Sequence, residues 1–238
     1  MNVLVTGGSS GLGKSIVQKL CSEKENHVYF TYNNSIKSAK NICSKFSNTT
    51  AIKCNFSNNL ELHTFLKNIK SLEITTLINN FYSWPKNPLM PGTFLTKNFH
   101  KIDEDIFIDE FKKNIMPTIL ITQEVISNFR KRKSGKIITI LSSFLDSPTI
   151  GSSIYISNKN YLKGLARVWS VENIKFNITS NTISPSFMLT PQTLKMDERM
   201  IDQFQKNSNE LLTVENVSDK ILNFLNDTDG KYDHDIQL

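Results

Sequence analysis

The sequence has few cysteines and no long apolar run. Only three of its 238 residues are cysteine, Cys21, Cys43 and Cys54, and their spacing matches no common metal-binding motif. No stretch approaches the roughly 18 apolar residues of a membrane span. The first predicted strand begins at Asn2, which leaves no room for a signal peptide. We therefore expect a reduced, cytoplasmic protein without structural disulfides, without a metal site and without a membrane partner.

The chain has a net charge of +6 but only one compact basic cluster. Residues 130–133 read Arg-Lys-Arg-Lys and Lys136 follows, at the end of a predicted helix. We favour the interpretation that these side chains lie in solvent and complement the dipole at the end of the helix. The alternative is a docking patch for an acidic partner, such as a phosphorylated substrate or carrier. No recognised nucleic-acid-binding module accompanies the cluster, so we expect no nucleic-acid partner.

Apolar strands and amphipathic helices alternate along the whole chain. Strands are predicted over residues 2–6, 27–32, 50–54, 74–78, 136–142, 177–183 and 235–238, and helices over 12–22, 35–46, 60–69, 103–132, 153–172 and 214–225, with a break near Pro117. This alternation predicts an α/β fold: a Rossmann-type, doubly wound parallel sheet with helices on both faces, in three α/β/α layers. No linker or repeat divides the sequence, so we expect a single dinucleotide-binding domain over residues 1–238.

A glycine-rich turn follows the first predicted strand and opens the first helix. Glycines at positions 7, 11 and 13 favour a tight turn, close approach of a pyrophosphate to the backbone, and close packing of the helix on the strand. The helix N-terminus supplies N–H groups and the positive end of its dipole to phosphates. The candidate cofactor-binding residues here are Thr6, Gly7, Ser9, Ser10, Gly11, Leu12 and Gly13.

The ends of the next strands add further candidates for binding the cofactor. After the second strand come Tyr32, Asn33, Asn34 and Ser35, with no acid to bind a ribose 2′-hydroxyl, which favours NADP and leaves NAD open. After the third strand, Asn55 and Phe56 lie where an adenine edge is expected, although Asn55 also suits a turn. Asn79 and Asn80 end the fourth strand, beside the expected cleft.

Tyr155 and Lys159 are spaced to share one face of a helix. An ammonium in that position favours the tyrosinate and lowers the pKa of the tyrosine, which suits a phenol to proton transfer at a carbonyl or alcohol oxygen. Ser142 ends the preceding predicted strand, at the edge where open α/β sheets bind ligands. The pair alone is a weak signal, and the glycine-rich turn, Asn79-Asn80 and Asn114 strengthen it because they occur in the expected order.

Together these motifs resemble the classical short-chain dehydrogenase/reductase family over nearly the whole chain. The Thr6–Gly13 turn, Asn79-Asn80, the tetrad Asn114, Ser142, Tyr155 and Lys159, and Pro185 to Thr190 carry the resemblance. The pattern is most similar to that of 3-oxoacyl-acyl-carrier-protein reductases. The resemblance implies hydride transfer between the nicotinamide of NAD(P) and a carbonyl or secondary alcohol, with ketone reduction favoured.

The resemblance also implies a role for each of these residues. Tyr155 would be the general acid in reduction and the base in oxidation, and Ser142 would stabilise charge on the substrate oxygen. Lys159 would bind the nicotinamide ribose and lower the pKa of Tyr155. Asn114 would hold a water that links Lys159 to solvent. Pro185, Thr190 and the backbone of Ile183 would lie at the nicotinamide.

Three segments depart from the family pattern. Phe81-Tyr82 replaces Ala-Gly and either reshapes the cofactor cleft or walls the substrate pocket. Residues 81–101 form an extended loop on the substrate side, a lid or an oligomer contact, that contains Trp84, Pro85, Pro88, Pro91 and Phe94. Residues 187–209 are predicted to be a flexible substrate loop, whose Phe187 and Met188 face either the substrate or the core.

The chain ends at Leu238 without the family's glycine-rich terminus. We therefore expect a homodimer through the two long helices and leave a tetramer open. The substrate is a carbonyl compound, either carrier-bound and acyl-like or a sugar or other small metabolite. The alternative to an enzyme is a catalytically silent protein that senses NADP or serves as a scaffold.

Overall fold

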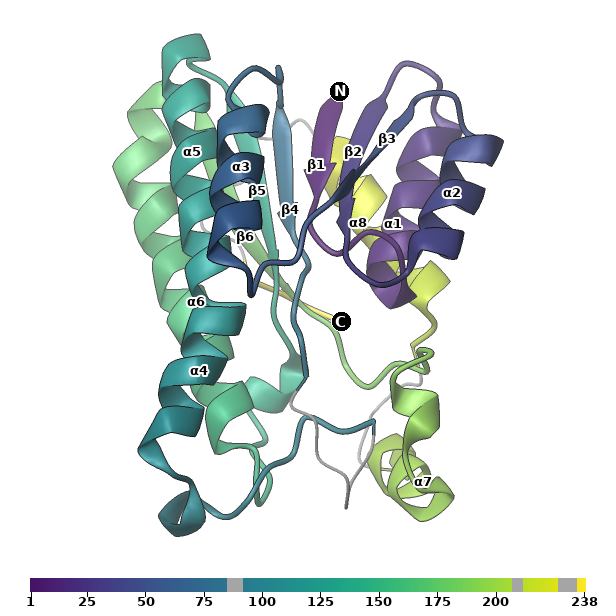
Figure 1. Cartoon of the computed structure of the whole chain (residues 1–238), viewed down its shortest axis with the longest axis vertical. Helices are drawn as coiled ribbons and strands as arrows, with labels where there is room; N and C mark the ends of the chain where they lie inside the picture. Colours follow the sequence, from purple (N-terminus) through teal and green to yellow (C-terminus); the bar gives the residue numbers. More distant parts are fainter. Residues whose placement is uncertain (85–91, 207–211, 227–234) are drawn as a thin grey trace.

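The protein folds around one parallel sheet. In the computed structural model, residues 1–84, 92–206, 212–226 and 235–238 are described. Within them seven strands run parallel in the order β3-β2-β1-β4-β5-β6-β7 (Figure 1). Their bounds are β1 Asn2–Val5, β2 His27–Tyr32, β3 Thr49–Lys53, β4 Thr76–Asn79, β5 Gly135–Ile140, β6 Ile178–Ser184 and β7 Asp235–Gln237. The predicted doubly wound α/β fold is confirmed.

Helices cover both faces of the sheet. The helices α1 (Gly11–Ser22), α2 (Ile36–Lys45) and α8 (Val214–Asn226) pack on one face, and α3 (Asn59–Ile69), α5 (Met116–Arg132) and α6 (Ser153–Asn173) pack on the other (Figure 1). Strand alternation separates the two cores: Val3 and Val5 of β1 join the first, while Leu4 between them joins the second. Both faces of the central strands are therefore apolar, as buried parallel strands require.

The long helix predicted over residues 103–132 is two helices. Ile115 alone separates helix α4 (Glu104–Asn114) from α5, and Pro117 lies in the first turn of α5. Proline fits a first helical turn because backbone N–H groups there have no acceptor within the helix, so the missing N–H costs no hydrogen bond. The break predicted near Pro117 is confirmed, and it leaves Asn114 at the end of α4.

A further helix lies beyond the carboxyl edge of the sheet. Helix α7 (Glu198–Lys206) occupies part of the segment that the sequence predicted to be a flexible loop (Figure 1). Short 3-10 turns also lie at Phe99–Lys101, Ser143–Leu145, Ile174–Phe176 and Thr193–Lys195. The loop predicted over residues 187–209 therefore contains a helix that was not predicted from the sequence. No helix in the described part of the chain is long and apolar enough to cross a membrane.

The basic cluster at the end of α5 lies at the opposite edge of the sheet from the glycine-rich turn. The Arg130 Nε donates to Asn173 Oδ1 at 2.6 Å, and the Arg132 guanidinium donates to the carbonyl of Ile74, just before β4 begins. These bonds tie the cluster to the amino ends of the strands. A docking patch there would not lie beside a ligand at the carboxyl edge.

Candidate active site

The glycine-rich turn is built so that only glycine fits at its key positions. Gly7 and Gly11 adopt φ angles of +68° and +50°, in the left-handed region that disfavours side chains. A Cβ on Gly13 would lie 2.3 Å from the Gly7 carbonyl oxygen. The first turn of α1 contains no acidic residue, and its N-cap, Ser10, makes no side-chain capping bond. The exposed backbone of Ser10 and Gly11 therefore suits an anionic pyrophosphate.

A cavity of about 970 Å³ runs from this turn to the residues around Tyr155. It is lined by most of the predicted cofactor-binding residues: Gly7, Ser9, Ser10, Gly11, Leu12, Gly13, Tyr32, Asn33, Asn34, Ser35, Asn55, Phe56, Asn80, Tyr155, Lys159, Pro185 and Thr190. No carboxylate lies among its described lining residues, whereas Lys159 and Lys195 do. The cavity therefore has room and positive charge for a dinucleotide.

Two predicted cofactor-binding residues, Thr6 and Asn79, do not line this cavity. The Thr6 hydroxyl accepts the backbone N–H groups of Asn80 and Phe81, each at 3.0 Å. Asn79 Nδ2 donates to Thr122 Oγ1 at 3.0 Å inside the second core. Both side chains therefore bond to the framework behind the cavity and not to its lining.

Asn80 joins the glycine-rich turn to the end of β4. Its Nδ2 donates to the carbonyl oxygens of Thr6 at 3.0 Å and Gly7 at 3.2 Å. Elsewhere in the lining, Asn55 Oδ1 accepts the N–H of Ser57 at 3.1 Å, so Asn55 stabilises its own turn as well as lining the cavity. The turn chemistry predicted for Asn55 is confirmed, and its place at an adenine edge stays a prediction.

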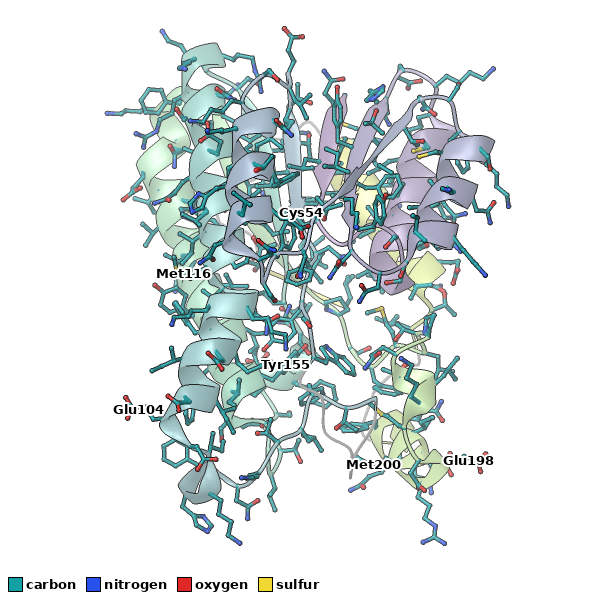
Figure 2. The ribbon with its side chains drawn as sticks, viewed as in Figure 1. Cys54, Glu104, Met116, Tyr155, Glu198 and Met200 are labelled. Atoms are coloured by element: carbon teal, nitrogen blue, oxygen red, sulfur yellow. The ribbon has the colours of Figure 1, made fainter. Side chains whose placement is uncertain are left out.

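Ser142, Tyr155 and Lys159 come together at the carboxyl end of β5. Tyr155 lies beyond the carboxyl edge of the sheet, on the same side as Glu198 and Met200 of α7 (Figure 2). A hydrogen bond with Ser142 lowers the pKa of Tyr155, but burial outweighs it and raises that pKa to about 12. Lys159 Nζ donates to the Ile140 carbonyl oxygen at 2.7 Å, and burial lowers its pKa to about 7.

The prediction that Lys159 lowers the pKa of Tyr155 is wrong for this structure. Lys159 Nζ lies 5.9 Å from the centre of the Tyr155 ring but only 4.9 Å from that of the Tyr82 ring. Both Lys159 and Tyr155 are removed from water, and desolvation disfavours the charged form of each. Sequence spacing placed the two residues on one helix face, but burial depends on the segments that cover that face.

Asn114 is fully buried and its side-chain amide is fully engaged. Its Oδ1 accepts the Ser83 N–H at 2.7 Å, and its Nδ2 donates to the Ser83 carbonyl at 3.1 Å and to Glu110 Oε2 at 2.9 Å. Asn114 therefore holds the segment that follows β4. A water between Asn114 and Lys159 stays a prediction.

The five predicted substrate-side residues, Phe81, Tyr82, Trp84, Phe187 and Met188, all line the cavity. Phe81 packs edge-on against Phe56 with ring centres 4.9 Å apart. The Tyr82 hydroxyl accepts Asn158 Nδ2 at 3.2 Å, and its ring meets Tyr155 edge-on at 5.2 Å. Both aromatic residues therefore wall the cavity. Pro85, Pro88 and Pro91 of the extended loop lie outside the described residues.

Several residues that line the cavity are not among the predicted site residues. They include Phe94, which belongs to the extended loop, and Phe144, Thr193 and Met196. Phe144 follows Ser142 by two residues, a proximity that the sequence does show. The contribution of Met196 depends on how the chain folds back after β6, which no local pattern indicates.

Comparison with known proteins identifies the family. The sequence model of the family described as short chain dehydrogenase matches residues 1–200, so the chain belongs to this family. Its relatives include the human protein named inactive hydroxysteroid dehydrogenase-like protein 1, 25% identical over 197 residues. The match covers 80% of this chain but only 56% of the human protein.

A second relative is the Staphylococcus epidermidis 3-oxoacyl-acyl-carrier-protein reductase FabG, 26% identical over 208 residues. That match covers 85% of this chain and 81% of the reductase. Similar solved structures include a Serratia marcescens short-chain dehydrogenase/reductase variant, with a TM-score of 0.85, 21% identity and coverage of 100% of this chain and 95% of the other. ElxO with NADP bound has a TM-score of 0.83 and 21% identity, with coverage of 99% and 96%. These structures share the fold.

Proposed function

We propose that the protein is an NADP-linked oxidoreductase that interconverts a ketone and a secondary alcohol, with ketone reduction as its main direction. The observation that carries this proposal is the grouping of Ser142, Tyr155 and Lys159 at the end of a cavity that begins at the glycine-rich turn. Asn114 completes the tetrad at the end of α4. When bound, the cofactor supplies or accepts the hydride at the carbon of the carbonyl group.

The protein's own side chains would donate the proton to the substrate oxygen and stabilise the negative charge that develops on it. The Tyr155 phenol carries its proton at neutral pH, because burial raises its pKa to about 12, and it is therefore ready to protonate the substrate oxygen in reduction. The Ser142 hydroxyl would donate a hydrogen bond to the same oxygen and stabilise its negative charge. Lys159, bonded to the Ile140 carbonyl, would orient the ribose beside Tyr155.

The choice of NADP rests on the end of β2. The cavity is lined there by Tyr32, Asn33, Asn34 and Ser35, whose side chains offer neutral hydrogen-bond donors for a 2′-phosphate. None of them is an acid that would bind a ribose 2′-hydroxyl and so select NAD. The NADP in the ElxO structure is consistent with this choice.

A catalytically silent, NADP-binding protein is the second candidate. Tyr155 is only 7% exposed, and the ring of Phe94 stacks on its face with centres 4.3 Å apart. A substrate must pass these rings to reach the phenol. The human relative whose name includes the word inactive gives this candidate further support.

A titration and one variant separate the two candidates. NADPH should bind to the wild type more tightly than NADH, measured by energy transfer from Trp84 and Trp169 to the reduced nicotinamide. Tyr155→Phe should keep NADPH binding and lose at least a hundredfold in the rate of ketone-dependent NADPH oxidation. Binding without turnover of any ketone in the wild type would favour the silent protein, and no binding of either cofactor would refute both candidates.

A further inference from the structure

The face of the Tyr155 ring is covered by Phe94. The two rings stack with centres 4.3 Å apart and planes 25° apart, and Phe94 is only 3% exposed. Three further rings surround Phe94, with their centres 5.8 Å away for Trp84, 5.2 Å for Phe144 and 6.2 Å for Phe204 of α7. The ring of Phe94 is therefore held in place by close packing on several sides.

A short strap, residues 92–96, carries this covering ring and is fixed at both ends. At one end, Gly92 lies so close to the backbone of Gln192 that a Cβ on it would be 2.7 Å from the Gln192 carbonyl oxygen. The φ angle of Gly92, +77°, also lies in the left-handed region that favours glycine. At the other end, the Gly151 carbonyl oxygen accepts the Thr96 N–H at 2.8 Å and the Thr96 hydroxyl at 3.1 Å. The strap therefore adds a backbone restraint to the packing of the ring.

The two hydroxyls that a substrate oxygen must reach lie beside the covering ring. Ser142 and Tyr155 line the cavity together with Phe94 and Phe144, and both hydroxyl-bearing residues are buried. The backbone N–H of Phe144 donates to Ser142 Oγ at 3.3 Å. A carbonyl oxygen bound by Ser142 and Tyr155 therefore brings one substituent of its carbonyl carbon against Phe94, which already fills the space over the phenol ring.

We propose that Phe94 limits the size of the substrate: the ketone carries a small substituent, of methyl size, on the side that meets this ring. The inference rests on the proposed ketone–alcohol interconversion and names the residue that selects among ketones. A ring held in place selects by steric exclusion, because a well-packed interior resists an added group. An aryl or branched substituent on that side would have to displace Phe94 and the rings behind it.

Removal of the ring should allow a larger ligand to bind. In Phe94→Ala the vacated space is bordered by the rings of Tyr155, Trp84 and Phe144. An engineered apolar cavity of about 150 Å³ binds benzene, so this space should accept one phenyl group. Burial of a phenyl group that the wild type excludes should raise the affinity for a phenyl-bearing ligand by roughly tenfold to a hundredfold.

The test compares two alcohols that share a butyl group. Methyl butyl carbinol and phenyl butyl carbinol are titrated into the protein with NADPH bound, a complex that cannot turn over, and saturation-transfer NMR measures their affinities. We expect the wild type to bind the methyl compound at least about tenfold more tightly than the phenyl compound. Phe94→Ala should bind the phenyl compound roughly tenfold to a hundredfold more tightly than the wild type does. Benzene should also raise the melting temperature of Phe94→Ala and leave that of the wild type unchanged.

Matched variants exclude a general effect of an added cavity. Phe129→Ala removes an equally buried ring near the end of α5, outside the described lining of the cavity, and should leave the order of the two alcohols unchanged. Phe94→Val substitutes for Phe94→Ala if that variant fails to fold, and should give a smaller increase in affinity for the phenyl compound. A wild type that binds the phenyl compound as tightly as the methyl compound, or a folded Phe94 variant with no increase, would overturn the proposal.

Failure of this proposal is distinguishable from failure of the proposed function. If phenyl butyl ketone oxidises NADPH on the wild type as readily as methyl butyl ketone does, the function stands and the size limit is refuted. If the alcohols show the size limit in binding but no ketone oxidises NADPH on the wild type or on Phe94→Ala, the size limit stands and the enzymatic function is wrong.

Discussion

The side-chain amide of Asn114 binds both the N–H and the carbonyl of Ser83, at 2.7 and 3.1 Å. Asn114 ends α4, and Ser83 follows the Tyr82 ring that covers Lys159. These two hydrogen bonds therefore fix the cavity wall at Ser83 to the end of α4. Glu110, which accepts Asn114 Nδ2 and pairs with Lys113 Nζ at 2.8 Å, fixes the orientation of the amide.

Replacing Asn114 should destabilise the fold. In Asn114→Ala the partly buried N–H and carbonyl of Ser83 and the buried carboxylate of Glu110 lose a partner, and an unsatisfied buried group costs about 1–3 kcal/mol. We expect the free energy of unfolding in urea to fall by about 2–4 kcal/mol. Asn128→Ala removes a single, exposed bond of 3.3 Å to the Lys70 carbonyl and is the control. Equal stability of the two variants would show that the Asn114 bonds contribute little.

The ring of Tyr82, more than its hydroxyl, should support the site. Tyr82→Phe loses only the bond that the hydroxyl accepts from Asn158 and should lower the free energy of unfolding by about 1 kcal/mol. Tyr82→Ala removes the ring that packs beside both Lys159 and Tyr155 and should lower the free energy of unfolding by about 3–5 kcal/mol. Thermal or chemical unfolding of both variants measures the difference. A larger loss in Tyr82→Phe than in Tyr82→Ala would contradict this account.

Burial of the Lys159 ammonium should make stability depend on pH. Its pKa falls from 10.5 to about 7 on folding, so between these values the unfolded chain binds more protons than the folded chain. The free energy of unfolding of the wild type should therefore rise with pH, relative to Lys159→Met, from about pH 7 towards pH 10.5. Urea unfolding of the wild type and of Lys159→Met at several pH values measures the difference between their free energies of unfolding. The titration of Tyr155 is common to both proteins and cancels in this difference. A pH-independent difference would show that Lys159 is not desolvated.

The raised pKa of Tyr155 should appear in the oxidation of an alcohol. Oxidation needs the phenolate as a base, and burial raises the pKa of Tyr155 to about 12. We therefore expect kcat/KM for alcohol oxidation to rise continuously from pH 7 to pH 10, by at most about tenfold per pH unit. Tyr155→Phe should abolish the reaction at every pH. A plateau near neutral pH would show instead that Lys159 and the bound cofactor lower the pKa of Tyr155.

We propose that α6 contributes to a homodimer contact. Its outer surface presents Tyr161, Val168 and Val171, which are 46%, 47% and 72% exposed. A glutamate in place of Val171 would bring a charge into that contact, so Val171→Glu should shift the protein from dimer to monomer in sedimentation or light scattering. Leu60→Glu, at a 78% exposed position on α3, is the control and should leave the dimer intact. A monomeric wild type, or a dimeric Val171→Glu, would refute the contact.

Local patterns in the sequence were sufficient to predict the sheet and the glycine-rich turn. The turn at residues 7–13 needs glycine because the backbone there adopts positive φ angles and because Gly13 packs against the Gly7 carbonyl. The break near Pro117 follows from the chemistry of proline itself. Such features depend on residues adjacent in the chain, and a single sequence displays them.

Contacts between distant segments could not be predicted in this way. The sequence placed Tyr155 and Lys159 on one helix face, which is correct, but their pKa values depend on Phe94 and Tyr82, which belong to the segment after β4. Thr6 and Asn79 were expected at the cofactor, yet their side chains bond to neighbouring backbone and to α5. The amino-acid sequence by itself therefore determined the fold, which depends on periodicity, and the family resemblance, which depends on motifs that one sequence displays, whereas the catalytic roles of the tetrad stay a prediction. Only the tertiary structure decided how far the reacting phenol is buried and which rings surround it, because desolvation depends on every segment that packs around the group.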